Sequence, residues 1–322
     1  MDTDSMNQSS RLWKHLSSPD FGPLYVLSEG IMKTEDDGRD LLPDLRNCRS
    51  IFVASDYSGD HNTADFQILS FLIGDDQSLP EWDMARITVR KDYLQNREMS
   101  YKQLNDKIRA RALLPFLMAA KAISGLSITV AIHKKVASLF SIKRLNLSEL
   151  GLEKYSHWDI SILEKLFRVA NFIGFFIAGL SRSSQHIHWI TDEDAIVANE
   201  KYMAEAKEVC DIALRFYLEY YKSTLSCETT AFDNSTMQIK DLVAIPDLIA
   251  GALSETVTQM YTNKSMPIDK KVVPLPDPIR PKNNEIISWF ADQHHSLKRF
   301  LCVIPPRSSP WKTQLIDFQR LE

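Results

Sequence analysis

Short apolar runs bounded by polar or turn-forming residues dominate the first part of this chain. Runs of this length that are rich in β-branched and aromatic residues are typical of strands, and strict alternation with polar residues indicates a strand with one solvated face. Residues 85–90, where Ile87 and Val89 alternate with polar residues, show the second pattern. We predict strands at 50–55, 65–74, 85–90, 126–133 and 186–191, the first three forming an antiparallel meander because their connections are short.

Longer segments carry apolar residues three or four apart, which predicts helices. Residues 160–181 are apolar on nearly every side in their second half, so we expect a deeply buried helix. Pro246 and Asp247 are expected to open another helix, because proline suits a first turn, while 239–245 fits either a strand or a lead-in to it. Further helices are predicted at 101–124, 195–221 and 285–300, a polar loop at 226–236 and a strand-like run at 300–304.

The spacing of these elements divides the chain into three parts. Residues 1–47 contain turn-forming residues and an acidic run, so we expect an N-terminal extension over the core. Residues 48–261 carry the regular succession of strands and helices and form the predicted core. Residues 262–322 begin with a Pro- and Lys-rich stretch, typical of an extended arm, and end in a C-terminal extension.

Composition limits the possible classes of protein. The 322 residues are 44% hydrophobic and 25% charged, as in ordinary globular proteins, and the net charge of −4 gives no overall attraction to nucleic acid. Four scattered cysteines without a C-x-x-C pair favour a reducing, cytoplasmic location over a disulfide framework or zinc knuckle. We expect no secretory signal and no membrane partner, because the most apolar stretch, 169–180, is too short to span a bilayer.

Carboxylates stand where predicted strands end. Strand ends gather at one edge of an open sheet, where ligands commonly bind, so acids that are far apart in sequence can converge there. The candidates are Asp56 and Asp60 around the end of the first strand, Asp192, Glu193 and Asp194 after the strand at 186–191, and Asp247 at a predicted helix start.

Such a cluster suits divalent metal chemistry. Mg²⁺ and Mn²⁺ are hard ions that prefer oxygen ligands, and two of them about 4 Å apart can clamp the attacking and leaving oxygens of a phosphodiester. We therefore predict a Mg²⁺ or Mn²⁺ site in which Asp56, Asp192 and Asp247 are catalytic ligands, assisted by Asp194 and Asp60.

The order and motifs of these segments resemble known proteins. Three strands followed by alternating helices and strands resemble the ribonuclease H-like topology, in which two parallel strands join three antiparallel ones. The acidic motifs resemble the bacterial and phage domain-of-unknown-function 3800 family, which opens with Asp-Glu-Ser-Gly-Asp (or Asn), carries Asp-Glu after a later strand and closes with Gln-Leu-Ala-Asp-Leu-Ile-Ala-Gly-Ala. The matching residues are Asp56-Tyr57-Ser58-Gly59-Asp60, Asp192-Glu193 and Ala244-Ile245-Pro246-Asp247-Leu248-Ile249-Ala250-Gly251-Ala252.

The resemblance covers about residues 50–260 and implies an α/β fold with a five-stranded mixed sheet flanked by helices. Tyr57 departs from it, standing where the family has Glu. The strand at 126–133 ends in His133-Lys134-Lys135, where ribonuclease H has an acid. These departures keep open an alternative: a catalytically inactive scaffold that binds or interacts without chemistry.

Each candidate also has an ordinary structural role open to it. Asp60 suits a turn, Thr191 or Asp192 suits a cap for the long helix predicted at 195–221, and Asp247 would stabilise the dipole at a helix start. His188 fits a general base or a hydrogen-bonded structural residue, since it alternates with His186 on one strand face. Lys134 fits a phosphate contact or a solvated surface charge.

The sequence lacks the motifs of several other chemistries, among them a phosphate-binding Gly-rich loop, a G-x-S-x-G elbow and H-E-x-x-H. We therefore predict a metal-dependent nuclease that cleaves RNA or DNA. The resemblance alone places it in phage defence or host conflict. Nucleic acid is the expected partner, and a protein partner or homo-oligomer remains open.

Overall fold

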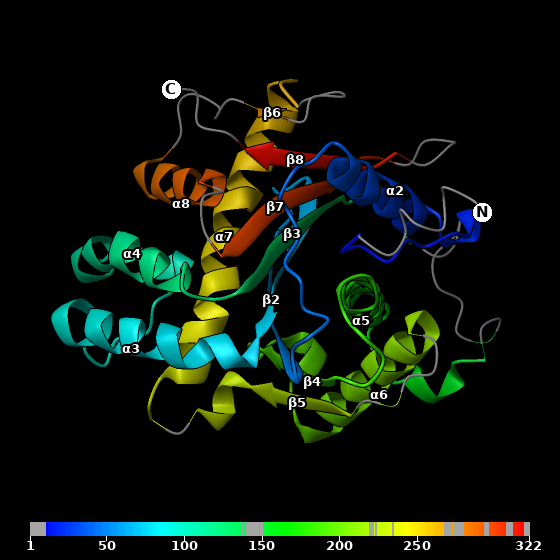
Figure 1. The fold of residues 1–322 in the computed structure, drawn as a ribbon, viewed down its shortest axis with the longest axis horizontal. Helices are drawn as coiled ribbons and strands as arrows, with labels where there is room; N and C mark the ends of the chain where they lie inside the picture. Colours follow the sequence, from blue (N-terminus) through cyan, green and yellow to red (C-terminus); the bar gives the residue numbers. More distant parts are fainter. Residues whose placement is uncertain are drawn as a thin grey trace.

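A mixed β-sheet between two layers of helices organises the chain (Figure 1). The computed structural model describes residues 11–136, 138–139, 148, 151–218, 222, 224–233, 235–266, 272–273, 280–292, 296–306 and 312–318. The predicted α/β class with flanking helices is confirmed. The strands are β1 (Ser50–Ser58), β2 (Phe66–Asp75), β3 (Gly125–His133), β4 (His186–Thr191), β5 (Leu225–Thr229), β6 (Val272–Val273), β7 (Leu297–Ile304) and β8 (Gln314–Phe318).

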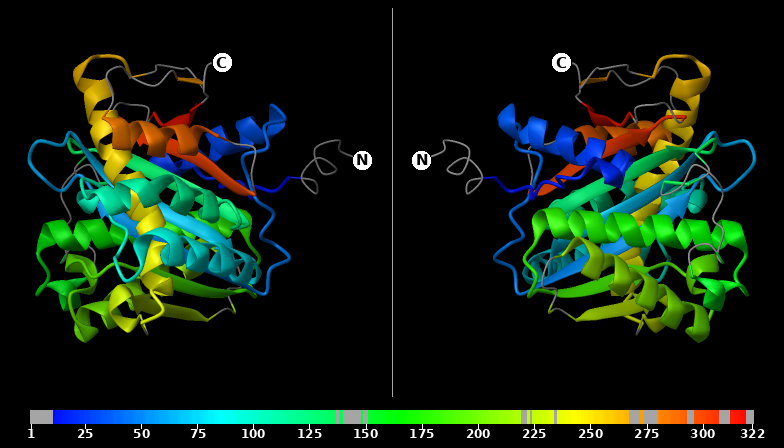
Figure 2. Two further views of the ribbon diagram at one scale, coloured as in Figure 1. Left: turned by 90° about the vertical axis from the view of Figure 1, so that its left-hand side faces the viewer. Right: turned by 90° about the vertical axis from the view of Figure 1, so that its right-hand side faces the viewer.

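Each face of the sheet has its own hydrophobic core. Helices α2, α5 and α6 cover one face, and α3, α4, α7 and α8 cover the other. The side views show the two layers in turn, with α3 and α4 in front in one and α5 in front in the other (Figure 2). The helices are α2 (Pro23–Asp36), α3 (Leu79–Val89), α4 (Lys107–Ala120), α5 (Ile160–Leu180), α6 (Glu200–Tyr217), α7 (Gln238–Thr262) and α8 (Pro281–Ala291).

The strand order is β5-β4-β1-β2-β3-β7-β8-β6. β1, β2 and β3 pair antiparallel, and β4 pairs parallel with β1 while β5 pairs parallel with β4. Ser55 on β1 is in register with Thr191 on β4. Asp56 follows Ser55 and Asp192 follows Thr191, so the register brings both acids to the same edge of the sheet.

The predicted strand at 85–90 is wrong, because these residues belong to α3 and the helical turn that continues it. Arg86 and Arg90 are one helical turn apart, and both are buried against Asp241 of α7. The alternation of charged and apolar residues therefore marks a helix whose charges point inward, and a local pattern cannot distinguish this from a solvated strand face.

Two further strand assignments change. Residues 126–133, predicted as a parallel addition, lie in β3 and pair antiparallel with β2. The predicted polar loop at 226–236 contains most of β5, a short strand whose middle residues are only partly buried. Beyond β3, the sheet continues into β7 and β8, so it has more strands than the five predicted.

Helix α7 begins earlier than predicted. It starts at Gln238, so Pro246 lies inside it rather than in its first turn, and Asp247 is not at a helix start. An internal proline leaves one backbone carbonyl without its helical partner. Burial of almost every residue from Asp241 to Ala252 offsets that loss, because the helix packs on β1 and β2.

Parts of both predicted extensions belong to the main body. Trp13 is buried near Gly179 of α5, and β7 pairs with β3 from Gly125 to Ile132. Residues 267–271 and 274–279 of the predicted Pro-rich arm lie outside the described residues, and its last residues belong to α8. Among the described helices, none combines the length and the apolar character needed to cross a membrane.

Candidate functional site

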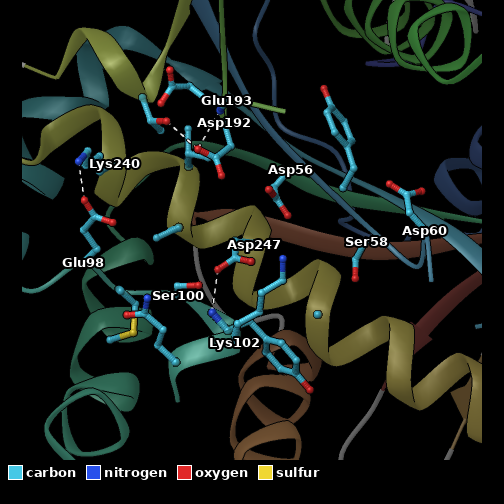
Figure 3. Close-up of a pocket in the computed structure, with 18 of the residues that line it drawn as sticks. Asp56, Ser58, Asp60, Glu98, Ser100, Lys102, Asp192, Glu193, Lys240 and Asp247 are labelled. Atoms are coloured by element: carbon cyan, nitrogen blue, oxygen red, sulfur yellow. Dashed lines mark hydrogen bonds and ion pairs between the residues drawn. The ribbon is translucent and has the colours of Figure 1, made fainter. Parts of the chain in front are cut away.

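A cavity of about 680 Å³ opens where β1 and β4 end, beside α7. Figure 3 shows Asp56, Asp192 and Asp247 around it, from β1, from the residue after β4 and from α7. The three acids predicted as catalytic ligands thus share one cavity, and Asp60 borders it too. The carboxylates that line it are Asp56, Asp60, Glu98, Asp192, Glu193, Asp233 and Asp247.

Alternation along β1 decides which side chains reach this cavity from the face under α7. Phe52 and Ala54 pack in the core beneath α7, and Asp56 continues the same face. Tyr57 packs against the opposite core, where its hydroxyl lies 2.7 Å from Ser55 Oγ. The ring of Tyr57 therefore packs on the face opposite to Asp56, although Tyr57 still borders the cavity.

The hydrogen bonding of Asp247 depends on a one-turn repeat in α7. Its Oδ2 accepts a hydrogen bond of 2.7 Å from the backbone N–H of Tyr101. One helical turn later, a Cβ on Gly251 would lie 2.2 Å from ring carbons of Tyr101. Asp247 and Gly251 thus face the same short helix, Tyr101–Gln103, and the glycine lets it pack closely. Part of the Asp-Leu-Ile-Ala-Gly motif is therefore explained by this docking.

Asp192 is exposed and held by its neighbours. Its Oδ1 accepts a hydrogen bond of 2.6 Å from Thr230 Oγ1 and one of 2.9 Å from the backbone N–H of Glu193. Thr230 follows β5, so the strand missing from the sequence prediction orients this acid.

Asp56 differs from the other two acids. Within the described residues, its carboxylate accepts no hydrogen bond. Burial, then the charges of Asp247 and Asp192, raise the pKa of Asp56 well above its usual value. Burial also raises the pKa of Asp247, and the hydrogen bond from the N–H of Tyr101 partly offsets this rise. Asp56 and Asp247 therefore resist ionising together unless a positive charge lies nearby.

Oxygen donors for a hard metal ion are present at Asp56, Asp192 and Asp247. They do not form a ready-made cage, because the described residues contain no group of three or more His, Cys, Asp or Glu side chains arranged to hold a metal ion. Thr230 and Glu193 hold Asp192 in its present orientation.

The two predicted assisting ligands bind a lysine instead. Lys165 of α5 lies 2.9 Å from Asp60 Oδ2 and 2.9 Å from Asp194 Oδ2. Asp194 also caps a short helix by accepting a hydrogen bond of 2.9 Å from the N–H of Ile196, whereas the cap was expected at Thr191 or Asp192.

His188 and Lys134 do not line this cavity. His188 is in register with Phe52, four residues before Asp56, and its Nε2 lies 3.4 Å from Glu228 Oε2. Lys134 borders a neighbouring pocket of about 520 Å³ and donates to the carbonyl of His61 at 2.5 Å. The structure therefore separates both from the three acids.

Several cavity residues carry no motif in the sequence. Glu98 and Lys240 form an ion pair there, and Lys102 extends into the same space (Figure 3). Lys240 lies seven residues before Asp247, hence on the same helix face, and recognising the true start of α7 would have revealed it. Glu98 lies in irregular chain, and Lys102 lies in the short helix Tyr101–Gln103, at the start of the helix predicted at 101–124.

Comparisons of the chain with protein-family models and with curated proteins found no match in either case. The interpretation of the site therefore depends on its geometry and chemistry, and the resemblance of its motifs stays a prediction.

Proposed function

We propose that this protein is a divalent-metal-dependent nuclease built on a ribonuclease H-like core. The observation that carries the proposal is the meeting of Asp56, Asp192 and Asp247 in one cavity. These acids come from three distant parts of the chain. Asp56 lies near the end of β1 and Asp192 directly follows the adjacent parallel strand β4, the usual place for a ligand site in an open sheet.

The strand order supports the ribonuclease H-like part of the proposal. The five strands β5-β4-β1-β2-β3 combine three antiparallel strands with two parallel additions, as the resemblance implies. With β3 as the third antiparallel strand, the first parallel addition is β4. The residue after β4 is Asp192. The strand that ends in His133 and Lys134, expected from the sequence to be this parallel addition, is the antiparallel β3.

The charges of the cavity support a bound cation. Asp56 lies near the like charges of Asp247 and Asp192 and accepts no hydrogen bond from the described residues, so a divalent ion would favour its ionised form. Asp56, Asp192 and Asp247 would hold Mg²⁺ or Mn²⁺ through their carboxylate oxygens. When bound, such an ion supplies Lewis-acid stabilisation of the charge that develops on a phosphodiester.

Residues beside the acids would orient a nucleic acid. Lys102 lies in the cavity next to Asp247, where its ammonium can contact a backbone phosphate. Lys240 already pairs with Glu98, so we assign it a positioning role for that carboxylate.

Cleavage assays test the proposal directly. Labelled single-stranded and duplex RNA and DNA are incubated with the parent and Asp56→Asn, with Mg²⁺, Mn²⁺ or EDTA. We expect metal-dependent cleavage by the parent and a loss of about 100-fold or more in the variant, more than removal of a supporting group usually costs. Asp211→Asn, at a surface ion pair on α6, is the matched control and should retain activity. Equal cleavage by parent and Asp56→Asn would contradict the assignment.

An inactive scaffold is the second candidate. The observation that favours it is the lack of a ready-made metal cage in the described part of the chain. A thermal melt separates the two, because an ion at 100 times its Kd stabilises the folded state by about 2.7 kcal/mol. A higher Tm with millimolar Mn²⁺ in the parent but not in Asp56→Asn supports the nuclease. An unchanged Tm supports the scaffold.

A further inference from the structure

A buried lysine lies beside the acidic cavity. The side chain of Lys165 is only 10% exposed, and its Nζ lies 2.9 Å from one oxygen each of Asp60 and Asp194. The same Nζ stands 4.8 Å from the centre of the Tyr57 ring. Two carboxylates and one aromatic face thus surround a single ammonium, an arrangement that offsets the cost of burying its charge.

Lys165 approaches the strand ends from the layer opposite to α7. It belongs to the early part of α5, which covers the face of the sheet that carries Tyr57. Its charge nevertheless reaches Asp56 and opposes the rise in the pKa of that carboxyl. The site therefore receives positive charge from this layer without any bound ion.

This arrangement divides the predicted ligands into two groups. Asp60 and Asp194 are bound to Lys165, whereas Asp56, Asp192 and Asp247 line the cavity without a direct ion pair in the described structure. A pair of divalent ions needs a bridging carboxylate and further carboxylates for each ion. Three carboxylates suffice for one hard ion completed by water.

We propose that Lys165 is a built-in cation that withdraws Asp60 and Asp194 from metal binding, so that the site holds one divalent ion and not two. The inference rests on the proposed function and specifies its metal stoichiometry. Lys165 acts as a positioning residue, because it touches carboxylates and not the substrate.

Metal counting by isothermal titration calorimetry with Mn²⁺ tests the inference without any substrate. We expect one ion per chain in the parent and in Lys165→Arg, which keeps the positive charge. In Lys165→Gln, Asp60 and Asp194 lose their cation, and a second, weaker Mn²⁺ should bind. Lys121→Gln is the matched control. The Lys121 side chain is 11% exposed, its Nζ lies 2.7 Å from Asp292 Oδ2, and neither residue lines the cavity. This variant should bind one ion.

The outcomes separate this inference from the proposed function. Two ions in the parent would overturn the role of Lys165 while leaving a metal nuclease intact. No ion in the parent would overturn both. A single ion in folded Lys165→Gln would overturn the inference, with circular dichroism confirming the fold.

If Lys165→Gln does not fold, Asp60→Asn decides the question. Asp60 is not a metal ligand in this proposal, so the variant should bind one Mn²⁺ with an affinity within about threefold of the parent. A loss of more than tenfold in affinity would show that Asp60 binds the ion and would overturn the inference.

Discussion

At the scale of single residues, the acids in and beside the cavity are distinguished by their partners. Asp247 accepts a backbone N–H, Asp192 a hydroxyl, and Asp194 both an N–H and an ammonium. Asp56 accepts none of these from the described residues, and burial and its acidic neighbours raise its pKa well above the usual value. The acid with the fewest partners is therefore the one most dependent on an added cation.

Asp56→Asn should stabilise the metal-free protein at neutral pH. Burial and the charges of Asp247 and Asp192 raise the pKa of Asp56 in the folded state above its unfolded value. The free energy of unfolding therefore falls as pH rises from the pKa of Asp56 in the unfolded chain to its pKa in the folded protein. Above the folded-state pKa the whole loss is present. In urea unfolding with EDTA at pH 8, we expect the free energy of unfolding of Asp56→Asn to exceed that of the parent by more than about 0.5 kcal/mol, the usual size of a surface effect.

The same experiment at low pH provides the internal control. Near pH 4 the parent's Asp56 is protonated in the folded state, so the advantage of the Asn variant should shrink. Asp211→Asn should stay within about 0.5 kcal/mol of the parent at both pH values. A gain that does not depend on pH would contradict the charge explanation.

At the scale of elements, α7 links the site to the core. Lys240, Asp247 and Gly251 lie along its cavity side, and Asp241 is buried against α3. Because the helix is buried over most of its length, its position is set by contacts with several other elements.

Gly251→Ala should move Tyr101 and weaken its hydrogen bond to Asp247. The added Cβ would lie 2.2 Å from the Tyr101 ring, so we expect a loss of about 1–3 kcal/mol, as for other overpacked sites. Gly30→Ala in α2 is the matched control. Its Cβ would meet only the end of the Leu315 side chain at 3.2 Å, and helix propensity favours alanine by up to about 1 kcal/mol. Denaturant unfolding of both variants measures the difference, and equal stabilities would contradict this account.

Asp241→Asn should destabilise the protein much more. Asp241 is fully buried and bound by Arg86 and Arg90, so removing its charge leaves buried Arg90 without a carboxylate and leaves Arg86 with Asp83 alone. We expect a cost of about 3–5 kcal/mol in urea unfolding.

Replacing all three charges provides the control for this prediction. The triple variant Arg86→Met, Arg90→Met, Asp241→Leu leaves no buried charge unpaired and should recover most of the lost stability. A single variant within 1 kcal/mol of the parent would indicate that the ion pairs contribute little.

At the scale of the whole molecule, the sheet crosses the domain boundary predicted from sequence. β3 lies in the predicted core, yet its far side pairs with β7 from the predicted C-terminal extension. Buried residues of β7 and α8 belong to the same hydrophobic cluster as α7.

A fragment comprising residues 48–261 should therefore be unstable. It would expose the edge of β3 and the apolar surface beneath α8, and exposed edge strands promote aggregation. We expect an insoluble fragment, or one that binds a hydrophobic dye and unfolds without a cooperative transition. A chain of residues 11–322 keeps every described contact and should unfold like the parent. A cooperative, soluble fragment would show that the predicted core folds alone.

The prediction from sequence succeeded where structure is local. The strands at 50–55, 65–74, 126–133 and 186–191 and the buried helix at 160–181 lie within observed elements or closely match them, because burial imposes a period that the sequence records. Asp56 and Asp192 were found because each directly follows such a strand. The helix at 85–90 was missed because its charges point inward toward a partner about 150 residues away.

The sequence alone thus determined the α/β class, most strands and helices, and the acids at strand ends. The tertiary structure decided the pairing of β3, the full length of α7, and which acids share a cavity. It alone paired Asp60 and Asp194 with Lys165. Periodicity reports the environment of a residue within its own element, whereas ion pairs and strand neighbours join segments far apart in the chain, and no local pattern encodes such partners.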